Sequence, residues 1–182
     1  MARNLSYIVP HRRRREGRTD YRQRLQLLRS GQPRFVVRRQ NSGLVCQFIA
    51  HDPAGDRTLV TATARHLLAA GWKGHCGNLP AAYLTGYLAG ARAKKAKIAQ
   101  AIADFGLHHF TPGSALAAAV KGAVDAGVAI PHDPEALPPA DRLSGKHIST
   151  YAASKPANKN QFSKSLPNLE AHIAEVKAKL AK

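Results

Sequence analysis

Four adjacent arginines near the N-terminus constrain the fold of this chain more than any other feature of its sequence. Residues 12–21 read RRRREGRTDY. The basic residues of this region are Arg12, Arg13, Arg14, Arg15, Arg18, Arg22, Arg24 and Arg29. Neighbouring guanidinium groups repel one another and bury no apolar surface, so the block cannot belong to a hydrophobic core. We expect a strongly anionic partner to lie against it, and we interpret that partner as RNA.

The positive charge is concentrated at both ends of the chain. Residues 1–39 hold 12 Lys/Arg against 2 acids, residues 40–143 hold 9 against 7, and residues 144–182 hold 7 against 2. The formal net charge of +17 therefore comes mainly from two basic ends around a nearly neutral middle. This asymmetry favours a nucleic-acid partner, whereas the alternative is a basic tail that is only solvated or attracted to membranes.

Length and composition predict one globular body with two basic extensions. A chain of 182 residues is long enough for one sizeable core and short for two. We expect an extended arm at 1–18 that orders on binding, an α/β body at 19–145 and a basic extension at 146–182. With no apolar run of about 18 residues and no secretory signal, we expect no membrane partner. Only two cysteines are present, which is typical of a cytoplasmic protein.

The segments after the arm carry local signals for a helix and a hairpin. Thr19 and Asp20 can both cap a helix that runs to about Ser30. We expect this helix to dock through Tyr21, Leu25 and Leu28. Apolar residues on either side of the sequence Asn-Ser-Gly at 41–43 then predict a hairpin. This hairpin carries Arg34, Arg38 and Arg39. Arg38, Arg39 and Gln40 lie at its tip, where the charge either meets a nucleic-acid groove or only keeps the hairpin soluble.

The remaining pattern completes an α/β domain. We expect a strand at 58–62, a short helix at 64–70, a long helix from 80 to about 103, a buried strand at 104–110 and a helix from about 114 to 127. Residues 131–145 follow as an ordered surface loop or the start of a tail, and an amphipathic helix at 168–182 ends the chain. Ala82, Gly86, Ala89 and Ala93 recur at helical spacing, which predicts close packing against another backbone. The order indicates two or three layers with a mixed sheet.

Motifs for catalysis or metal binding are weak. His75 and Cys76 lack the second ligand pair of a zinc site, and His108 and His109 would point to opposite faces of a strand as core or interface histidines. A nuclease is the enzymatic rival, but its metal ions need several converging carboxylates, and of the acids in the body only Asp104 falls in an expected core strand. We expect no catalytic residue, metal, cofactor or small-molecule substrate.

Two loops allow contact with RNA on local grounds. Gly71-Trp72-Lys73-Gly74 matches the glycine clamp of KH domains, although the order of elements around it does not. Such a loop can still bring its backbone and Lys73 close to RNA. Ser114 either caps its own helix or leaves backbone N–H groups free for a phosphate.

Three stretches resemble one known family. They are RRRREGRTDY at 12–21, GWKGHCGNLPAAYLTGYLAG at 71–90 and DFGLHHFTPGSALAAAVKGAVDAGVAIPH at 104–132. The family is the 5S rRNA-binding protein of the large ribosomal subunit, number eighteen in the universal naming, in its archaeal form. The resemblance covers about residues 5–150.

The resemblance implies a ribonuclease-H-like α/β body, of the kind found in components of the translational machinery, without catalytic carboxylates. It also implies a place in the central protuberance, where the protein contacts 5S rRNA, 23S rRNA and neighbouring ribosomal proteins including number five. The arginine block, the hairpin arginines and the loop at Trp72 and Lys73 match RNA-contacting segments of the family. On charge alone we add Lys94 and Lys95 of the long helix and Lys155 and Lys159 of the extension.

Overall fold

A four-stranded mixed sheet forms the centre of the computed structural model, which describes residues 8–154 and 168–181. The strands are β1 (Arg34–Gln40), β2 (Gly43–Ala50), β3 (Arg57–Thr63) and β4 (Ile102–Asp104). They lie in the order β3-β2-β1-β4, in which β1, β2 and β3 are antiparallel neighbours and β4 runs parallel to β1. The expected mixed sheet and the expected hairpin are confirmed.

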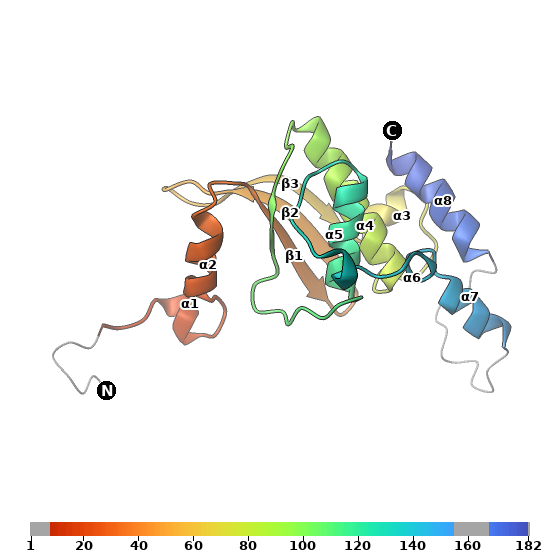
Figure 1. Ribbon diagram of the computed structural model, residues 1–182, viewed down its shortest axis with the longest axis horizontal. Coiled ribbons are helices and arrows are strands. Elements are labelled where there is room, and N and C mark those ends of the chain that lie inside the picture. Colours follow the sequence, from red (N-terminus) through yellow and green to blue (C-terminus); the bar gives the residue numbers. More distant parts are fainter. Residues whose placement is uncertain (1–7, 155–167, 182) are drawn as a thin grey trace.

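Helices flank this sheet on both sides. They are α1 (Arg12–Arg15), α2 (Tyr21–Leu28), α3 (His66–Ala69), α4 (Leu79–Lys95), α5 (Ala115–Asp125), the 3-10 helix η1 (Pro134–Ala136), α6 (Ala140–Leu143), α7 (Lys146–Ala153) and α8 (Leu169–Leu180). Figure 1 shows α4 and α5 against one face of the sheet, α8 beyond α4, and α1 with α2 on the opposite side. Within these described residues, no helix is both long and apolar enough to cross a membrane.

Alternation along the strands separates a core face from an open face. Phe35 and Val37 of β1 are fully buried in the main hydrophobic cluster, and the Phe35 ring lies 4.8 Å from that of Phe48 on β2. The intervening side chains point the other way because successive residues of a strand face opposite sides. We call this second side the open face; its residues are Arg34, Val36 and Arg38 of β1 and Val45, Gln47 and Ile49 of β2.

The core helices α4 and α5 approach at backbone distance. A Cβ atom added at Gly86 of α4 would collide with the carbonyl oxygen of Ala119, and one added at Gly122 of α5 would collide with that of Tyr83. The small residues predicted to meet another backbone are all buried, and Gly86 makes this contact with α5. This closely packed pair of helices forms the layer behind the sheet.

The chain after α4 differs from the expected long helix and buried strand. The helix ends at Lys95, and Lys97 adopts a left-handed conformation with φ of 60°. Only residues 102–104 form a strand, and residues 105–110 form a loop. The alanines and lysines at 91–97 all favour helix, so local propensity could not locate the stop.

Both ends of the chain also depart from the expectation. The arginine block forms the helical turn α1 rather than an extended arm, and residues 131–145, expected as a loop, contain η1 and α6. The predicted amphipathic helix is confirmed as α8, which buries Leu169, Ile173 and Val176 and packs against α4. The terminal helix therefore contributes to the core.

Candidate nucleic-acid interface

The helical turn α1 presents its arginines to solvent. None of its residues is buried, and Arg12 is paired only loosely, with its Nε 3.7 Å from a Glu16 oxygen. Arg13 Nε donates a hydrogen bond of 2.9 Å to the Thr19 hydroxyl. Because four basic side chains share one short turn and bury nothing, the block suits contact with a polyanion.

Helix α2 extends this basic surface. Asp20 caps it, accepting hydrogen bonds from the backbone N–H groups of Arg22 and Gln23, as the sequence predicted. The side chains of Arg22 and Arg29 are exposed. The expectation that Leu25 packs against the body is wrong, because this residue is 55% exposed.

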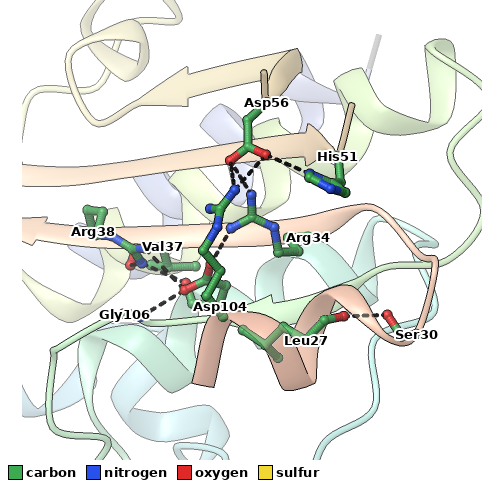
Figure 2. Close-up of polar contacts among 10 residues, drawn as sticks. Leu27, Ser30, Arg34, Val37, Arg38, His51, Asp56, Asp104 and Gly106 are labelled. Carbon is green, nitrogen blue, oxygen red and sulfur yellow. Dashed lines mark hydrogen bonds and ion pairs between the residues drawn. The ribbon is translucent and has the colours of Figure 1, made fainter. Parts of the chain in front are cut away.

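An ion pair, rather than apolar burial, anchors α2 to the body. Arg24 Nη2 lies 2.8 Å from both carboxylate oxygens of Asp56, which precedes β3. His51 and Arg34 also reach Asp56, at 3.2 and 2.6 Å. Three cationic or polar groups from separate segments therefore converge on one carboxylate (Figure 2).

This convergence sets the ionisation of Asp56. Partial burial by itself would raise the pKa, but hydrogen bonds from Arg24 and His51 and the positive charge of Arg34 hold the pKa of this carboxyl below its usual value. The carboxylate is therefore charged at neutral pH.

Arg34 and Arg38 form the second half of the network. Arg34 is only 4% exposed, and its Nη1 lies 2.8 Å from Oδ2 of the buried Asp104. Arg38 donates to the Asp104 carbonyl at 2.7 Å and to its Oδ1 at 3.1 Å. The same Oδ1 accepts the N–H of Gly106, which fixes the start of the loop after β4 (Figure 2).

These contacts change the roles that the sequence suggested for the hairpin arginines. Arg34 is buried in ion pairs, and Arg38 is half-buried and turned toward Asp104. The structure therefore gives Arg24 and Arg34 tasks in holding the fold together, whereas Arg39 at the hairpin end is exposed. The carboxylate partners were missed because they lie 22 and 70 positions from Arg34.

The loop at 71–78 separates Trp72 from Lys73. Trp72 is 2% exposed, and its ring stacks on His172 of α8 at 5.3 Å. The Lys73 N–H donates to His172 Nε2 at 3.1 Å, while the Lys73 side chain is exposed. The loop therefore offers a lysine to a partner and uses its tryptophan to hold the terminal helix.

A cavity of about 670 Å³ lies between α2 and the open face. The exposed Arg13 and Arg18 are part of its lining, as are buried groups of the ion-pair network. His108 lines this cavity and also a second hollow of about 440 Å³ beside Arg39. The expectation that His108 and His109 lie in a strand is wrong, and so is the core alternative, because both are exposed in the loop after β4. The interface alternative stays a prediction.

Other predicted basic residues lie away from this cavity. Lys94 and Lys95 are exposed at the end of α4, which Figure 1 shows apart from α1 and α2. Lys155 and Lys159 lie outside the described residues. At α5, Ser114 occupies the cap position without a side-chain capping bond, so the capping interpretation is wrong for its hydroxyl.

The acidic residues are engaged in structural contacts. Asp52 stabilises a turn, and Asp125 accepts from Tyr83 and pairs with Lys121. Within residues 8–154 and 168–181, no three His, Cys, Asp or Glu side chains are arranged to hold a metal ion. Burial raises the pKa of the Cys46 thiol, which suits a core residue rather than a nucleophile.

Comparison with known proteins points to one family. A family model described as "Ribosomal large subunit proteins 60S L5, and 50S L18" matches residues 6–101. The large ribosomal subunit protein uL18 of Methanococcus maripaludis is 48% identical over 190 residues, which cover 99% of this chain and 98% of that protein.

Proposed function

This chain belongs to the large-subunit ribosomal protein family that contains uL18, and we propose that it binds 5S rRNA and 23S rRNA and helps to attach 5S rRNA to the central protuberance. The family is one of structural ribosomal proteins and is not a class of enzymes. Its members act in the large subunit of the cytoplasmic ribosome. We extend the proposal to contact with neighbouring subunit proteins, including number five.

One observation carries the proposal: a dense arginine surface that buries nothing is held at a fixed place beside the sheet. The exposed cations of α1 and α2 contact phosphates and release their counterions, which supplies affinity without sequence information. The ion pair between Arg24 and Asp56 orders this surface before RNA arrives. The shape of the body then selects folded RNA over an arbitrary duplex.

We divide the RNA-contacting residues by their exposure. The arm at 1–18 and helix α2 make the main contact, followed by the hairpin end and the 71–78 loop. The contacting residues are Arg12, Arg13, Arg14, Arg15, Arg18, Arg22, Arg29, Arg39 and Lys73. Lys94 and Lys95, on a separate part of the body at 19–145, suit a second RNA segment. Lys155 and Lys159 of the extension at 146–182 are proposed on charge alone.

A binding competition tests this function. Purified chain is titrated with labelled 5S rRNA, with a 23S rRNA fragment and with duplex DNA of equal length at several salt concentrations. We expect the two rRNAs to bind more tightly than the DNA, and the chain to co-sediment with the large subunit. Equal affinity for duplex DNA would indicate a chromatin-type binder and contradict the proposal.

The same preparation separates an architectural role from a nuclease. With RNA folding held constant by monovalent salt, EDTA should leave the affinity unchanged, and incubation in Mg²⁺ should leave the RNA length unchanged. Progressive shortening of the RNA would revive the enzymatic alternative.

A further inference from the structure

The charged groups that line the cavity between α2 and the open face fall into two sets. The first contains two carboxylates, the buried Asp104 and the partly exposed Asp56, which are bound to arginines at 2.6–3.1 Å. An entering phosphate would meet these two carboxylates, while the arginines beside them are already paired. The second set contains Arg13 and Arg18. Arg18 is 67% exposed, and although its Nε lies 3.3 Å from a Glu16 carboxylate oxygen, this pair is open to solvent. The part beside the paired carboxylates therefore suits an uncharged group, and the part beside Arg13 and Arg18 suits an anion.

The walls provide surfaces for a flat, partly apolar group. Leu27 of α2 and Val36 and Ile49 of the open face line the cavity with aliphatic side chains. Tyr21 of α2 and His108 of the loop after β4 add two rings to the lining. The volume of about 670 Å³ falls in the range of roughly 300–1,000 Å³ that is typical of small-molecule pockets.

We propose that this cavity receives the base of one unpaired rRNA nucleotide, whose phosphate is held by Arg13 and Arg18. A nucleobase is flat, uncharged and able to stack, and loops or bulges of folded RNA present bases that are free of pairing. A paired base could not enter, so the cavity selects a particular irregularity in the RNA. The inference rests on the proposed function and names the RNA feature that is recognised beside the exposed arginines of α1 and α2.

Filling the cavity without altering any charge tests the proposal. Val36→Phe and Ile49→Trp each place a larger apolar side chain in the space of the base. Val45→Phe is the matched control, because Val45 lies on the same open face but does not line the cavity. Affinity for 5S rRNA and for the 23S rRNA fragment is measured at several salt concentrations, and thermal unfolding identifies the variants that keep the fold.

We expect both cavity variants to weaken binding of one of the two rRNAs roughly ten- to a hundredfold, which is the loss that follows removal of one stacked base. The dependence of the logarithm of affinity on the logarithm of salt concentration should keep its slope, because the phosphate contacts remain. Val45→Phe should bind like the unaltered chain. If Val36→Phe fails to fold, Ile49→Trp provides the test. Gln23→Ala is a third variant, which enlarges the cavity by shortening one of the side chains that line it.

Two results would overturn the inference while leaving the proposed function intact. The first is full affinity for both rRNAs in the folded cavity variants. The second is a fall in the salt slope together with the affinity, which would mean that the substitutions displace the arginine surface. Failure of the unaltered chain to bind either rRNA would instead remove the proposed function and the inference with it.

Discussion

Arg34 of β1 and Asp104 of β4 form a buried ion pair between adjacent parallel strands, with 2.8 Å between Nη1 and Oδ2. Arg34 also reaches Asp56, and Asp56 holds Arg24 of α2. A single buried arginine therefore connects the edge of the sheet to the carboxylate that anchors the basic helix. This link holds α2, and with it the exposed arginines of α1 and α2, beside the sheet.

Removal of the Asp104 carboxylate should destabilise the fold strongly. We expect Asp104→Asn to lower the free energy of unfolding by about 3 kcal/mol, the low end for a broken buried pair, because Arg34 keeps Asp56. Asp141→Asn is the control, since its pairing with Lys146 is exposed and long at 3.8 Å, and it should cost less than about 1 kcal/mol. Urea unfolding measures both, and equal effects would contradict the prediction.

Acid should weaken the anchor of α2 through Asp56. The pKa of this carboxyl is lower in the folded chain than in the unfolded one, so its contribution is complete above pH of about 4 and is lost as the pH falls through the folded value. Asp56→Asn should remove that part of the acid sensitivity and reduce stability at neutral pH by about 1–3 kcal/mol. Urea unfolding at several pH values between neutral and acid measures the free energy of unfolding. Asp52→Asn, in the same loop, is the control and should keep the pH dependence of the unaltered chain.

Neutralising the arginine block should reduce the number of phosphates contacted. Replacing Arg12–Arg15 with alanine should weaken 5S rRNA binding and lower the salt slope by roughly 3, at about 0.7–0.9 per lost contact. The matched replacement by lysine keeps the charge and should keep most of the slope. An unaltered slope in the alanine variant would show that the block does not contact RNA.

The arm should be dispensable for folding. A chain that begins at residue 19 loses α1, which has no buried residue, so cooperative thermal unfolding should persist with little change in the midpoint. Extending the truncation through α2 removes Arg24 and should lower the midpoint further. Loss of cooperativity in the shorter truncation would mean that the arm is part of the core.

The contact between α4 and α5 should depend on glycine in a graded manner. Gly86→Ala should destabilise by about 1–3 kcal/mol in spite of the better helix propensity of alanine, because the added carbon meets the backbone of Ala119. Gly90→Ala in the same helix meets the side-chain carbon of Ala126 at 2.6 Å and the backbone oxygen of Ala123 at 2.9 Å, which are longer than the closest approach at Gly86, so it should cost less. Thermal unfolding ranks the two, and the reverse order would contradict the packing.

Local signals accounted for much of the fold. Asp20, one of the two predicted candidates, caps α2, the hairpin turns where Asn-Ser-Gly predicted it, and Gly86 of α4 meets a second backbone. Each of these features depends on neighbours in the chain or on one periodicity. The exposure of the block at 12–15 could also be predicted from the sequence, because adjacent arginines repel one another and cannot be buried together.

Tertiary structure alone decided where the helix after Pro80 stops, which arginines are buried and where the cavity lies. Local propensity did not distinguish Lys95 from the residues that follow it, and only the turn at Lys97 brings β4 beside β1. Arg34 looked like any hairpin arginine until the fold supplied two carboxylates from distant segments. Charge density is a property of sequence, whereas the pairing of charges and the space between elements arise from long-range contacts that no local pattern contains.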